Sequence, residues 1–268
     1  MLEINKVHLW DCLELMKQIP DESIDLTVTS PPYDNLRTYN WYSWDFEGVA
    51  KELLRVTKVG GVIVWVVGDQ TIKGSETGTS FKQALYFKEC GFNLHDTMIY
   101  EKAGCPFPEK NRYYPCFEYM FVFSKGKPNT FNGIKDRKNL YPNSKIARKT
   151  HARQVDWTLK ENSAMKNEPD RRAWEYWVRF NIWRISNAHW VWWDSMNHPA
   201  PFPEKLAEDH ILSWSNEWDI VFDPFMWSWT TAKMAKINNR NFIWCEISQE
   251  YIDIANKRLA TTTVSLFH

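Results

Sequence analysis

The sequence predicts an α/β fold built on a doubly wound, mainly parallel β-sheet. Short apolar runs that suit buried strands alternate with segments whose apolar residues recur at helical spacing. One run, Val62–Val67, is apolar at every position, which is typical of a strand covered by helices on both faces. Ligands of open α/β sheets bind beyond the carboxyl ends of the strands. We therefore expect the functional site at that edge of the sheet.

The first half of the chain alternates regularly between the two kinds of element. Pro20 ends the first helix, Gly60-Gly61 turns the chain into the strand at Val62–Val67, and Gly91 follows the third helix as its stop. The predicted strands span residues 5–9, 24–28, 62–67, 93–101 and 117–124, and the predicted helices span 13–19, 46–56 and 79–90.

The last quarter of the chain returns to the same pattern. A Pro-rich stretch, His198–Leu206, opens a helix that runs to about Ser213, with Pro203 in its first turn. Strands are predicted at residues 220–222 and 241–244, and helices at 230–237 and 251–259. Asp223 and Glu246 follow the two strands. An acidic residue about 20 positions beyond a first strand is the expected acceptor for a ribose hydroxyl, and the spacing of this pair fits.

The segment between these halves is polar, basic and poorly periodic. From Lys125 to Arg184 there are 15 Lys and Arg against 6 Asp and Glu, in a chain whose net charge is zero. Such a surplus suggests a surface that faces a polyanion such as DNA, although a solvated basic face is the common alternative. Arg171, Arg172 and Arg184 stand among aromatic residues and are the candidate DNA-binding residues.

Length and composition narrow the class of protein. The 268 residues suit one α/β domain with an insert. No apolar stretch of about 18 residues is present, so no membrane span is expected, and the N-terminus lacks a signal pattern, which favours a cytoplasmic protein. The five cysteines are scattered without a C-x-x-C pair, so we expect neither a disulfide framework nor a metal site.

The stretch Thr29-Ser30-Pro31-Pro32-Tyr33 carries the clearest chemical signal. It follows the predicted strand at residues 24–28, and its two prolines end that strand and hold an extended loop. The loop presents a hydroxyl, a carbonyl and an aromatic face. These three groups suit a flat ring that bears an amino group.

Two motifs together resemble the amino-methyltransferases of DNA, which methylate N4 of cytosine or N6 of adenine with S-adenosylmethionine. Ser30–Tyr33 matches their catalytic tetrapeptide, Ser/Asp/Asn-Pro-Pro-Tyr/Phe, and Asp223–Thr231 matches their cofactor loop, Asp-Pro-Phe-x-Gly-Ser-Gly-Thr-Thr. The catalytic motif comes first, as in the permuted beta group. The resemblance implies a Rossmann-like fold with an antiparallel hairpin at one edge, double-stranded DNA as partner and a target base that is flipped out of the duplex.

The resemblance assigns roles residue by residue. Asp11 is expected to hold the cofactor's adenine, and it also suits the N-cap of the following helix. Residues 1–124 form the catalytic half, 125–195 the target-recognition insert and 196–268 the cofactor-binding half. The implied catalytic residues are Ser30, Pro31, Pro32 and Tyr33, and the implied cofactor-binding residues are Asp11, Cys12, Pro201, Phe202, Asp223, Pro224, Phe225, Ser228, Thr230, Thr231 and Glu246.

Tryptophan stands where this family has glycine. The chain holds 16 tryptophans and 10 glycines, whereas average glycine usage of about 7% would give roughly 19. Trp10, Trp218, Trp227, Trp229 and Trp244 all occupy glycine positions of the resembled family. Our hypothesis is that UGA codons meaning glycine in the source were read as tryptophan. The codons at these positions test it.

Several interpretations stay open from the residues alone. Serine in the first motif position favours cytosine over adenine. An amino-methyltransferase of RNA or of a protein amide is one alternative. A catalytically disabled DNA-binding protein is another, because Trp227 and Trp229 replace the cofactor-loop glycines. A cognate restriction endonuclease is a candidate partner, and either a monomer or a homodimer fits.

Overall fold

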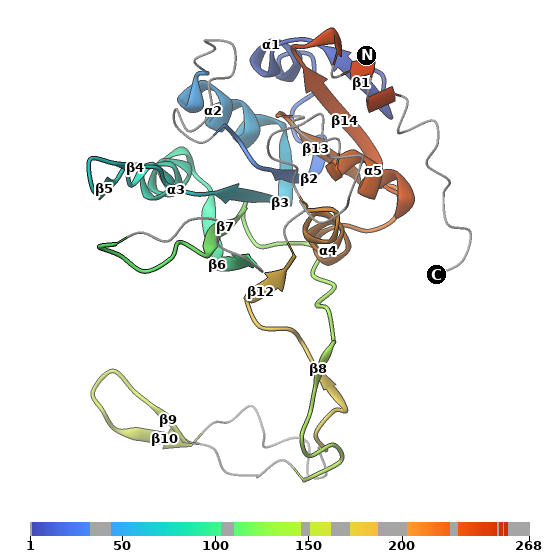
Figure 1. Cartoon of the computed structure of the whole chain (residues 1–268). Helices are drawn as coiled ribbons and strands as arrows, with labels where there is room; N and C mark the ends of the chain where they lie inside the picture. Colours follow the sequence, from blue (N-terminus) through green and yellow to red (C-terminus); the bar gives the residue numbers. More distant parts are fainter. Residues whose placement is uncertain are drawn as a thin grey trace. The chain divides into compact units, whose positions relative to one another are not determined.

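An eight-stranded sheet organises the fold in the computed structural model, which describes residues 2–32, 44–102, 110–145, 151–161, 172–186, 203–225, 230–250, 252–253 and 255–256. Neighbours from β1 to β3 are parallel, whereas β7 is antiparallel to both β3 and β6 (Figure 1). This confirms the predicted mainly parallel sheet. In spatial order the strands are β1 (Lys6–Leu9), β14 (Asn241–Glu246), β13 (Ile220–Asp223), β2 (Ile24–Thr29), β3 (Thr57–Val67), β7 (Phe117–Ser124), β6 (Asn93–Lys102) and β12 (Ile182–Ile185).

The expected antiparallel hairpin, formed by β6 and β7, lies towards one edge of the sheet, and one further short strand, β12, lies outside it. The strand β12 pairs in parallel with β6, with Ile182 opposite Ile99 and Ile185 opposite Lys102. Four residues inside a basic, poorly periodic segment carry too little alternation to mark a strand. The pairing with β6 makes β12 a strand, and that pairing is not encoded locally.

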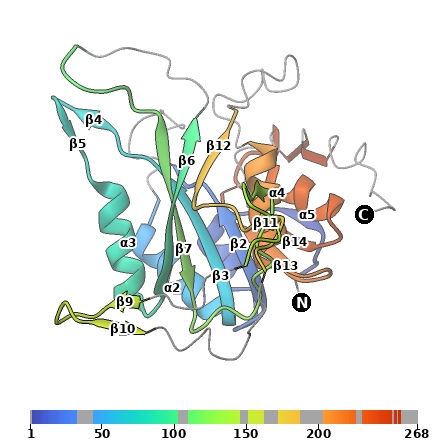
Figure 2. The ribbon, with the colours of Figure 1, turned by 90° about the horizontal axis from the view of Figure 1, so that it is seen from below.

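Helices cover both faces of the sheet. The helices α2 (Phe46–Val56) and α3 (Thr79–Cys90) lie on one face, and α4 (Glu204–Trp214) and α5 (Thr230–Ile237) lie on the other (Figure 2). The helix α1 (Cys12–Met16) packs into the same core as α2 and α3. This arrangement explains why the central strands are apolar on both sides. Among the described residues no helix is long and apolar enough to cross a membrane.

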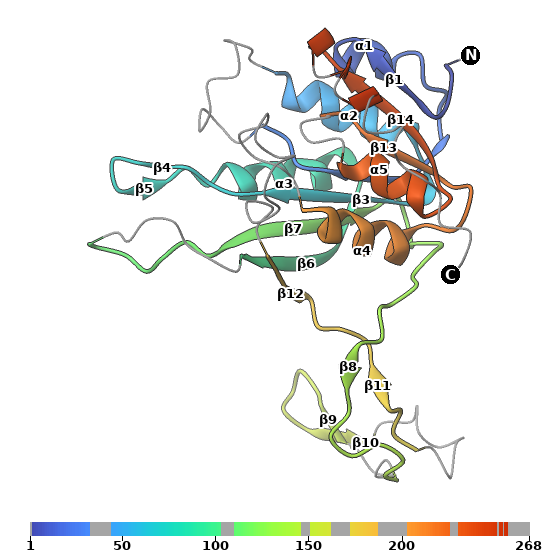
Figure 3. The same ribbon diagram turned by 45° about the vertical axis from the view of Figure 1, so that its right-hand side comes forward.

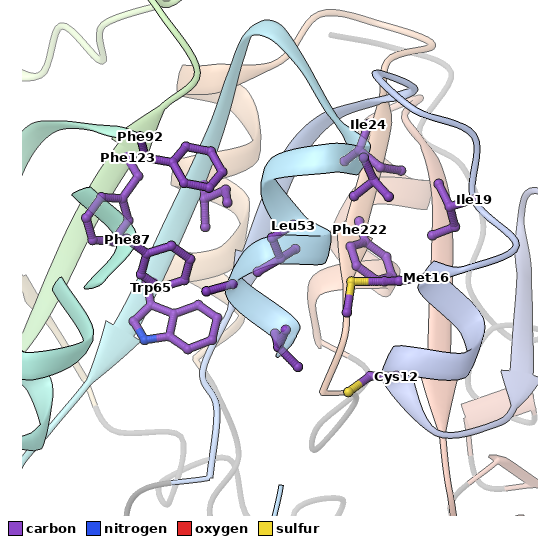
Figure 4. Packing of buried hydrophobic residues seen from close by; sticks show 14 of the residues in the cluster. Cys12, Met16, Ile19, Ile24, Leu53, Trp65, Phe87, Phe92, Phe123 and Phe222 are labelled. Carbon is purple, nitrogen blue, oxygen red and sulfur yellow. The ribbon is translucent and has the colours of Figure 1, made fainter. Parts of the chain in front are cut away.

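One hydrophobic core packs between the sheet and the first three helices. Trp65 of β3 is fully buried, and its indole N–H donates to Oε1 of Gln83 on α3 at 2.9 Å. Phe87 of α3 packs against Trp65 and Phe123, with ring centroids 5.0 and 4.6 Å away, and Leu53 of α2 lies beside them (Figure 4). Full burial of each such side chain contributes about 1.5–3 kcal/mol. This core fixes the ends of β2 and β3, where the site is expected.

Most predicted elements match the observed ones within a few residues. The spans of α2, α3 and α5 are as predicted, and Gly91 ends α3 with a φ of +120°. The strand β3 is longer than expected because it begins at Thr57, directly after α2, while α1 ends at Met16 instead of Ile19. Much of the expected closing helix at 251–259 lies outside the described residues.

The chain divides into two compact units. The large unit comprises residues 1–132 and 181–268, and the small unit comprises 133–180. The small unit spans fewer residues than the expected insert at 125–195. The Asn132 N–H donates to the Ser213 carbonyl at 2.8 Å, and the Ile99 N–H donates to the Asn181 carbonyl at 2.8 Å, so both flanks belong to the large unit. The small unit contains β8 (Arg137–Lys138), β9 (His151–Arg153), β10 (Leu159–Glu161) and β11 (Tyr176–Trp177).

Two tryptophans have backbone conformations that favour glycine. Trp218 has a φ of +71° in the turn from Asn216 to Asp219, and Trp157 has a φ of +66° in the loop that joins β9 to β10. Side chains rarely tolerate this region, and glycine is the usual residue in such turns. A third tryptophan, Trp244, is fully buried and its indole N–H has no acceptor among the described residues. The positive φ of Trp218 and the unsatisfied indole N–H of Trp244 support the hypothesis that glycine belongs at these two positions. The positive φ of Trp157 extends the same hypothesis to that residue.

Replacing Trp218 by glycine should stabilise the protein relative to replacing it by alanine. Both variants remove the exposed indole, but only glycine removes the Cβ that clashes at positive φ. We expect the free energy of unfolding of the Trp218→Gly variant to be about 1 kcal/mol higher than that of the Trp218→Ala variant. Urea denaturation measures this difference. Equal stabilities for the two variants would show that the backbone at Trp218 carries no strain.

Candidate active site at the carboxyl ends of the strands

A buried hydrogen bond joins the two predicted motifs. The Thr29 hydroxyl, at the end of β2, donates to Oδ1 of Asp223, at the end of β13, at 2.7 Å. The same carboxylate oxygen accepts from the Phe225 N–H at 3.0 Å. From the start of α5, the Thr231 hydroxyl donates to the Val28 carbonyl at 3.3 Å. The loop after β2 and the loop after β13 are therefore held side by side.

Burial dominates the electrostatics of Asp223. Loss of hydration raises the pKa of its carboxyl from 3.8 to about 7, although hydrogen bonds from Thr29, Phe225 and Thr231 act in the opposite direction. The negative charge of Glu246 adds to the increase. The carboxyl therefore exchanges its proton near neutral pH, which is unusual for aspartate and typical of functional sites.

Two further carboxyl groups stand at neighbouring strand ends. Glu246 ends β14, opposite Leu9 of β1, and burial raises its pKa from 4.5 to about 7. It accepts from the Ser248 N–H at 2.8 Å. Asp11 follows β1 and accepts from the Leu13 N–H at 2.9 Å, which confirms its N-cap role for α1. Three acidic residues thus stand at the ends of three adjacent strands.

The cysteines near these carboxyl groups do not suit nucleophilic chemistry. Burial, together with the charge of Asp11, raises the pKa of Cys12 to about 12. Burial also raises the pKa of Cys245 well above its usual value, and its thiol donates to the Pro224 carbonyl at 3.1 Å. Both are free thiols that remain protonated at neutral pH. Within the described residues, no group of His, Cys, Asp or Glu could hold a metal ion.

An aromatic cluster supports the loop after β13. The ring of Phe225 meets Trp44 edge-on at 4.9 Å between centroids and lies 6.2 Å from Trp65. Trp44 precedes α2, so the cluster connects the cofactor-loop motif to the segment that follows the catalytic motif. Nothing local in the sequence marks Trp44 or Trp65 for this role, because the contacts join distant parts of the chain.

Some of the predicted site residues belong to the part of the chain that the structure describes, and others lie outside it. Ser30 and Pro32 are half-buried, and Pro31 is buried, directly after Thr29. Thr230 and Thr231 are buried at the start of α5. The residues Tyr33, Arg171, Pro201, Phe202, Trp227, Ser228 and Trp229 lie outside the described residues. Thr29 was not among the predicted residues, and its signal is a polar side chain at the end of an apolar strand.

The predicted DNA-binding arginines that the structure describes belong to different compact units. Arg172 belongs to the small unit and donates to the Asn143 carbonyl at 3.0 Å. Arg184 belongs to the large unit, in β12, where it is exposed and lies 3.4 Å from Glu101.

Comparison with known proteins identifies the family. A family model described as DNA methylase matches residues 24–257. The orphan methyltransferase M.BamHII of Bacillus amyloliquefaciens is 62% identical over 248 residues, which cover 91% of this chain and 92% of that protein. The chain therefore belongs to the DNA methylase family, and it is an S-adenosylmethionine-dependent amino-methyltransferase of DNA.

Solved structures share the fold. The PvuII DNA methyltransferase (cytosine-N4-specific) superposes with a TM-score of 0.68 at 21% identity, over 99% of this chain and 89% of that one. A DNA modification methylase of Thermus thermophilus, complexed with S-adenosyl-L-methionine, superposes with a TM-score of 0.63 at 22% identity, over 97% of this chain and 96% of that one. These likenesses confirm the expected Rossmann-like methyltransferase fold.

The residues at the strand ends fit this cofactor chemically. Its adenine amine, ribose hydroxyls and methionine ammonium are hydrogen-bond donors. Asp11, Glu246 and Asp223 supply acceptors at the ends of β1, β14 and β13, which are adjacent strands. A row of acceptors at these strand ends therefore suits a molecule with a row of donors.

Asp223 should make stability depend on pH. Its pKa is higher in the folded than in the unfolded chain, so its protonated form stabilises the fold. That contribution is complete below about pH 4 and is lost as the pH rises through about 7. Asp223→Asn keeps the oxygen that accepts from Thr29 and removes the titration. We expect urea unfolding to show a smaller loss of stability between pH 5 and pH 8 in this variant. A pH dependence identical to that of the parent chain would contradict the assignment.

Proposed function

We propose that the chain methylates N4 of cytosine, in preference to N6 of adenine, in double-stranded DNA. The observation that carries this proposal is the bond from Thr29 to Asp223, which holds the Ser30–Pro32 loop against the cofactor-loop motif. A base amine held by the first loop would then lie next to a methyl donor held by the second. Serine in place of aspartate at the first motif position favours cytosine.

The chemistry requires the loop to hold an amine that is a weak nucleophile, because its lone pair is conjugated with the ring. Hydrogen bonds from the NH₂ group to the Ser30 hydroxyl oxygen and the Pro31 carbonyl would keep the nitrogen in line and favour pyramidal geometry. Tyr33 would stack on the ring. Bound S-adenosylmethionine supplies the methyl group, and the chain contributes mainly by positioning. The base must leave the duplex to reach this loop.

The cofactor roles follow the order of the strand ends. We assign the adenine amine to Asp11, the ribose hydroxyls to Glu246 and the methionine end to Asp223 and the first turn of α5. Cys12, Pro224, Phe225, Thr230 and Thr231 would line the same site, with Pro201, Phe202 and Ser228 as further candidates. The observed burial of Asp223 and Glu246 supports these roles, because exposed carboxylates would prefer water.

The small unit is the proposed target-recognition insert. Among its described residues only Ala173 is a buried hydrophobic residue, whereas Tyr141, Trp174 and Phe180 are more than half exposed. Arg137 lies over the Phe180 ring at 3.9 Å and Lys135 over the Trp174 ring at 5.2 Å. Exposed aromatic rings beside cations suit contacts with bases and phosphates. Residues 1–124 and 196–268 remain the proposed catalytic and cofactor-binding halves.

The similar proteins give one indication about a restriction endonuclease partner. M.BamHII is described as an orphan methyltransferase, which favours a protein that works without a cognate restriction endonuclease. Monomer and homodimer both remain compatible, and a protein that acts on bacterial DNA is expected in the cytoplasm. Family membership disfavours RNA or a protein amide as the substrate.

Ser30→Ala should lower turnover by at least about 100-fold and leave cofactor affinity nearly unchanged, because a preorganised hydrogen bond at the reacting atom is lost. Methylation of plasmid DNA with labelled cofactor measures turnover, and calorimetry measures cofactor binding. Mass spectrometry of the digested DNA should detect N4-methylcytosine. N6-methyladenine as the product would overturn the cytosine proposal, and full turnover by Ser30→Ala would remove this residue from the mechanism.

A second candidate function is a DNA-binding protein without catalysis, which Trp227 and Trp229 favour. Titration of S-adenosylmethionine into the chain, beside a Trp227→Gly, Trp229→Gly variant, separates the two. We expect micromolar affinity in the glycine variant and much weaker binding in the chain as written, because glycine lets the backbone approach the ligand. Equal affinity in both would mean that the loop accommodates tryptophan. Absence of binding in both would refute the cofactor site.

A further inference from the structure

A small hairpin follows β3 at the edge of the sheet that holds the site. Its strands are β4 (Thr71–Ile72) and β5 (Ser75–Glu76), and all residues from 71 to 76 are exposed. Lys73 and Gly74 form the tip with φ of +50° and +82°, as in a type I′ turn. The hairpin begins four residues after Val67, and β3 is the neighbour of β2. It therefore projects from the same edge of the sheet as the catalytic loop.

Hydrogen bonds hold the base of this hairpin. The Asp69 carboxylate accepts from the Ser80 N–H at 2.9 Å and from the hydroxyls of Ser80 and Thr77. The Thr77 N–H donates to the Gln70 carbonyl at 2.9 Å. An isolated two-stranded hairpin is only marginally stable in water. These bonds make the hairpin a fixed projection of the large unit.

A second segment supports the hairpin from the side. Arg112, on the chain that leads into β7, donates to the Thr71 hydroxyl at 2.9 Å and to the Gly74 carbonyl at 2.8 Å. Figure 3 shows the hairpin and this segment projecting from the same end of the sheet. We call residues 71–76 and 110–114 together the hairpin surface.

The composition of the hairpin surface suits a nucleic acid. Lys73 and Lys110 are exposed, and with Arg112 they outnumber the one acidic residue, Glu76. Tyr113 is 98% exposed, and Tyr114 and Ile72 are at least half exposed. Rigid aromatic side chains beside cations can stack on bases while the cations meet phosphates. Gln70 directly precedes the hairpin, and its side-chain amide oxygen is buried without a donor among the described residues. This oxygen can accept a hydrogen bond from a polar partner.

We propose that the hairpin surface is a second contact for duplex DNA, separate from the small unit. The proposal rests on the proposed function, because it needs the target base to enter at Ser30. Base pairs rise by about 3.4 Å, so phosphates flanking a base at the end of β2 must pass close to the end of β3. Lys73 and Lys110 contact those phosphates, and Tyr113 packs against a base beside the target. A second copy of this chain would bring the same surplus of positive charge and is disfavoured.

The test measures binding of a labelled duplex of mixed sequence to the full chain by fluorescence anisotropy across a range of salt. The Lys73→Ala, Lys110→Ala double variant should bind at least tenfold more weakly at low salt. The slope of log Kd against log salt should fall in magnitude by about 1.8, which corresponds to two lost phosphate contacts. Tyr113→Ala should weaken binding about tenfold, as expected for a lost stacking contact.

Lys88→Ala is the matched control. Lys88 is exposed in the last turn of α3, at the other end of that helix from Asp69 and the hairpin, and its loss should change neither affinity nor slope. Cofactor affinity should stay constant in every variant. Affinity and slope equal to those of Lys88→Ala would overturn the proposal while leaving the proposed function intact. A changed oligomeric state by light scattering, with unchanged DNA affinity, would identify a self-association surface and also overturn it. Absence of duplex binding by the parent chain would refute the proposed function itself.

Discussion

The hydrogen bond between Thr29 and Asp223 is the contact on which the site depends. It joins residues 194 positions apart in the sequence, inside the sheet, where both partners are buried. A buried carboxyl group without a partner would be costly. Because Thr29 ends β2 and Asp223 ends β13, satisfying this carboxyl group also sets the distance between the catalytic loop and the cofactor loop. The need of the buried Asp223 carboxyl group for a hydrogen bond thus aligns the catalytic motif with the cofactor-loop motif.

The same burial sets the chemistry of the site. Asp223 is buried and Glu246 is half-buried, and loss of hydration raises the pKa of each carboxyl group to about 7. This arrangement does not stabilise the fold, because a carboxylate has a lower free energy in water than in the protein interior. A ligand rich in hydrogen-bond donors and carrying positive charge can offset this cost. The strand ends are therefore suited to S-adenosylmethionine before any ligand contact is considered.

The tryptophans show the opposite situation, in which local conformation and residue type disagree. At Trp157 and Trp218 the backbone adopts positive φ although the side chain opposes it. At Trp244 the fold buries an indole N–H that has no acceptor among the described residues. Natural sequences usually agree with their fold at the local level. Trp218 and Trp244 occupy glycine positions of the family, so the conflicts there point to the identity of these residues more than to a special function for them.

The sequence by itself determined the class of fold, most strands and helices, and the two motifs, because each depends on neighbouring residues: apolar runs, helical spacing, prolines and glycines. It also marked Asp11, Asp223 and Glu246, since polar residues after apolar strands stand out locally. Only the tertiary structure decided that β12 pairs with β6 outside the hairpin, that the small unit ends at residue 180, and that Arg184 and Arg172 belong to different units. It alone revealed the hydrogen bond from Thr29 to Asp223 and the contact of Trp44 with Phe225 of the cofactor loop. These features arise from contacts between segments far apart in the chain, and such contacts leave no local pattern in the residues that make them.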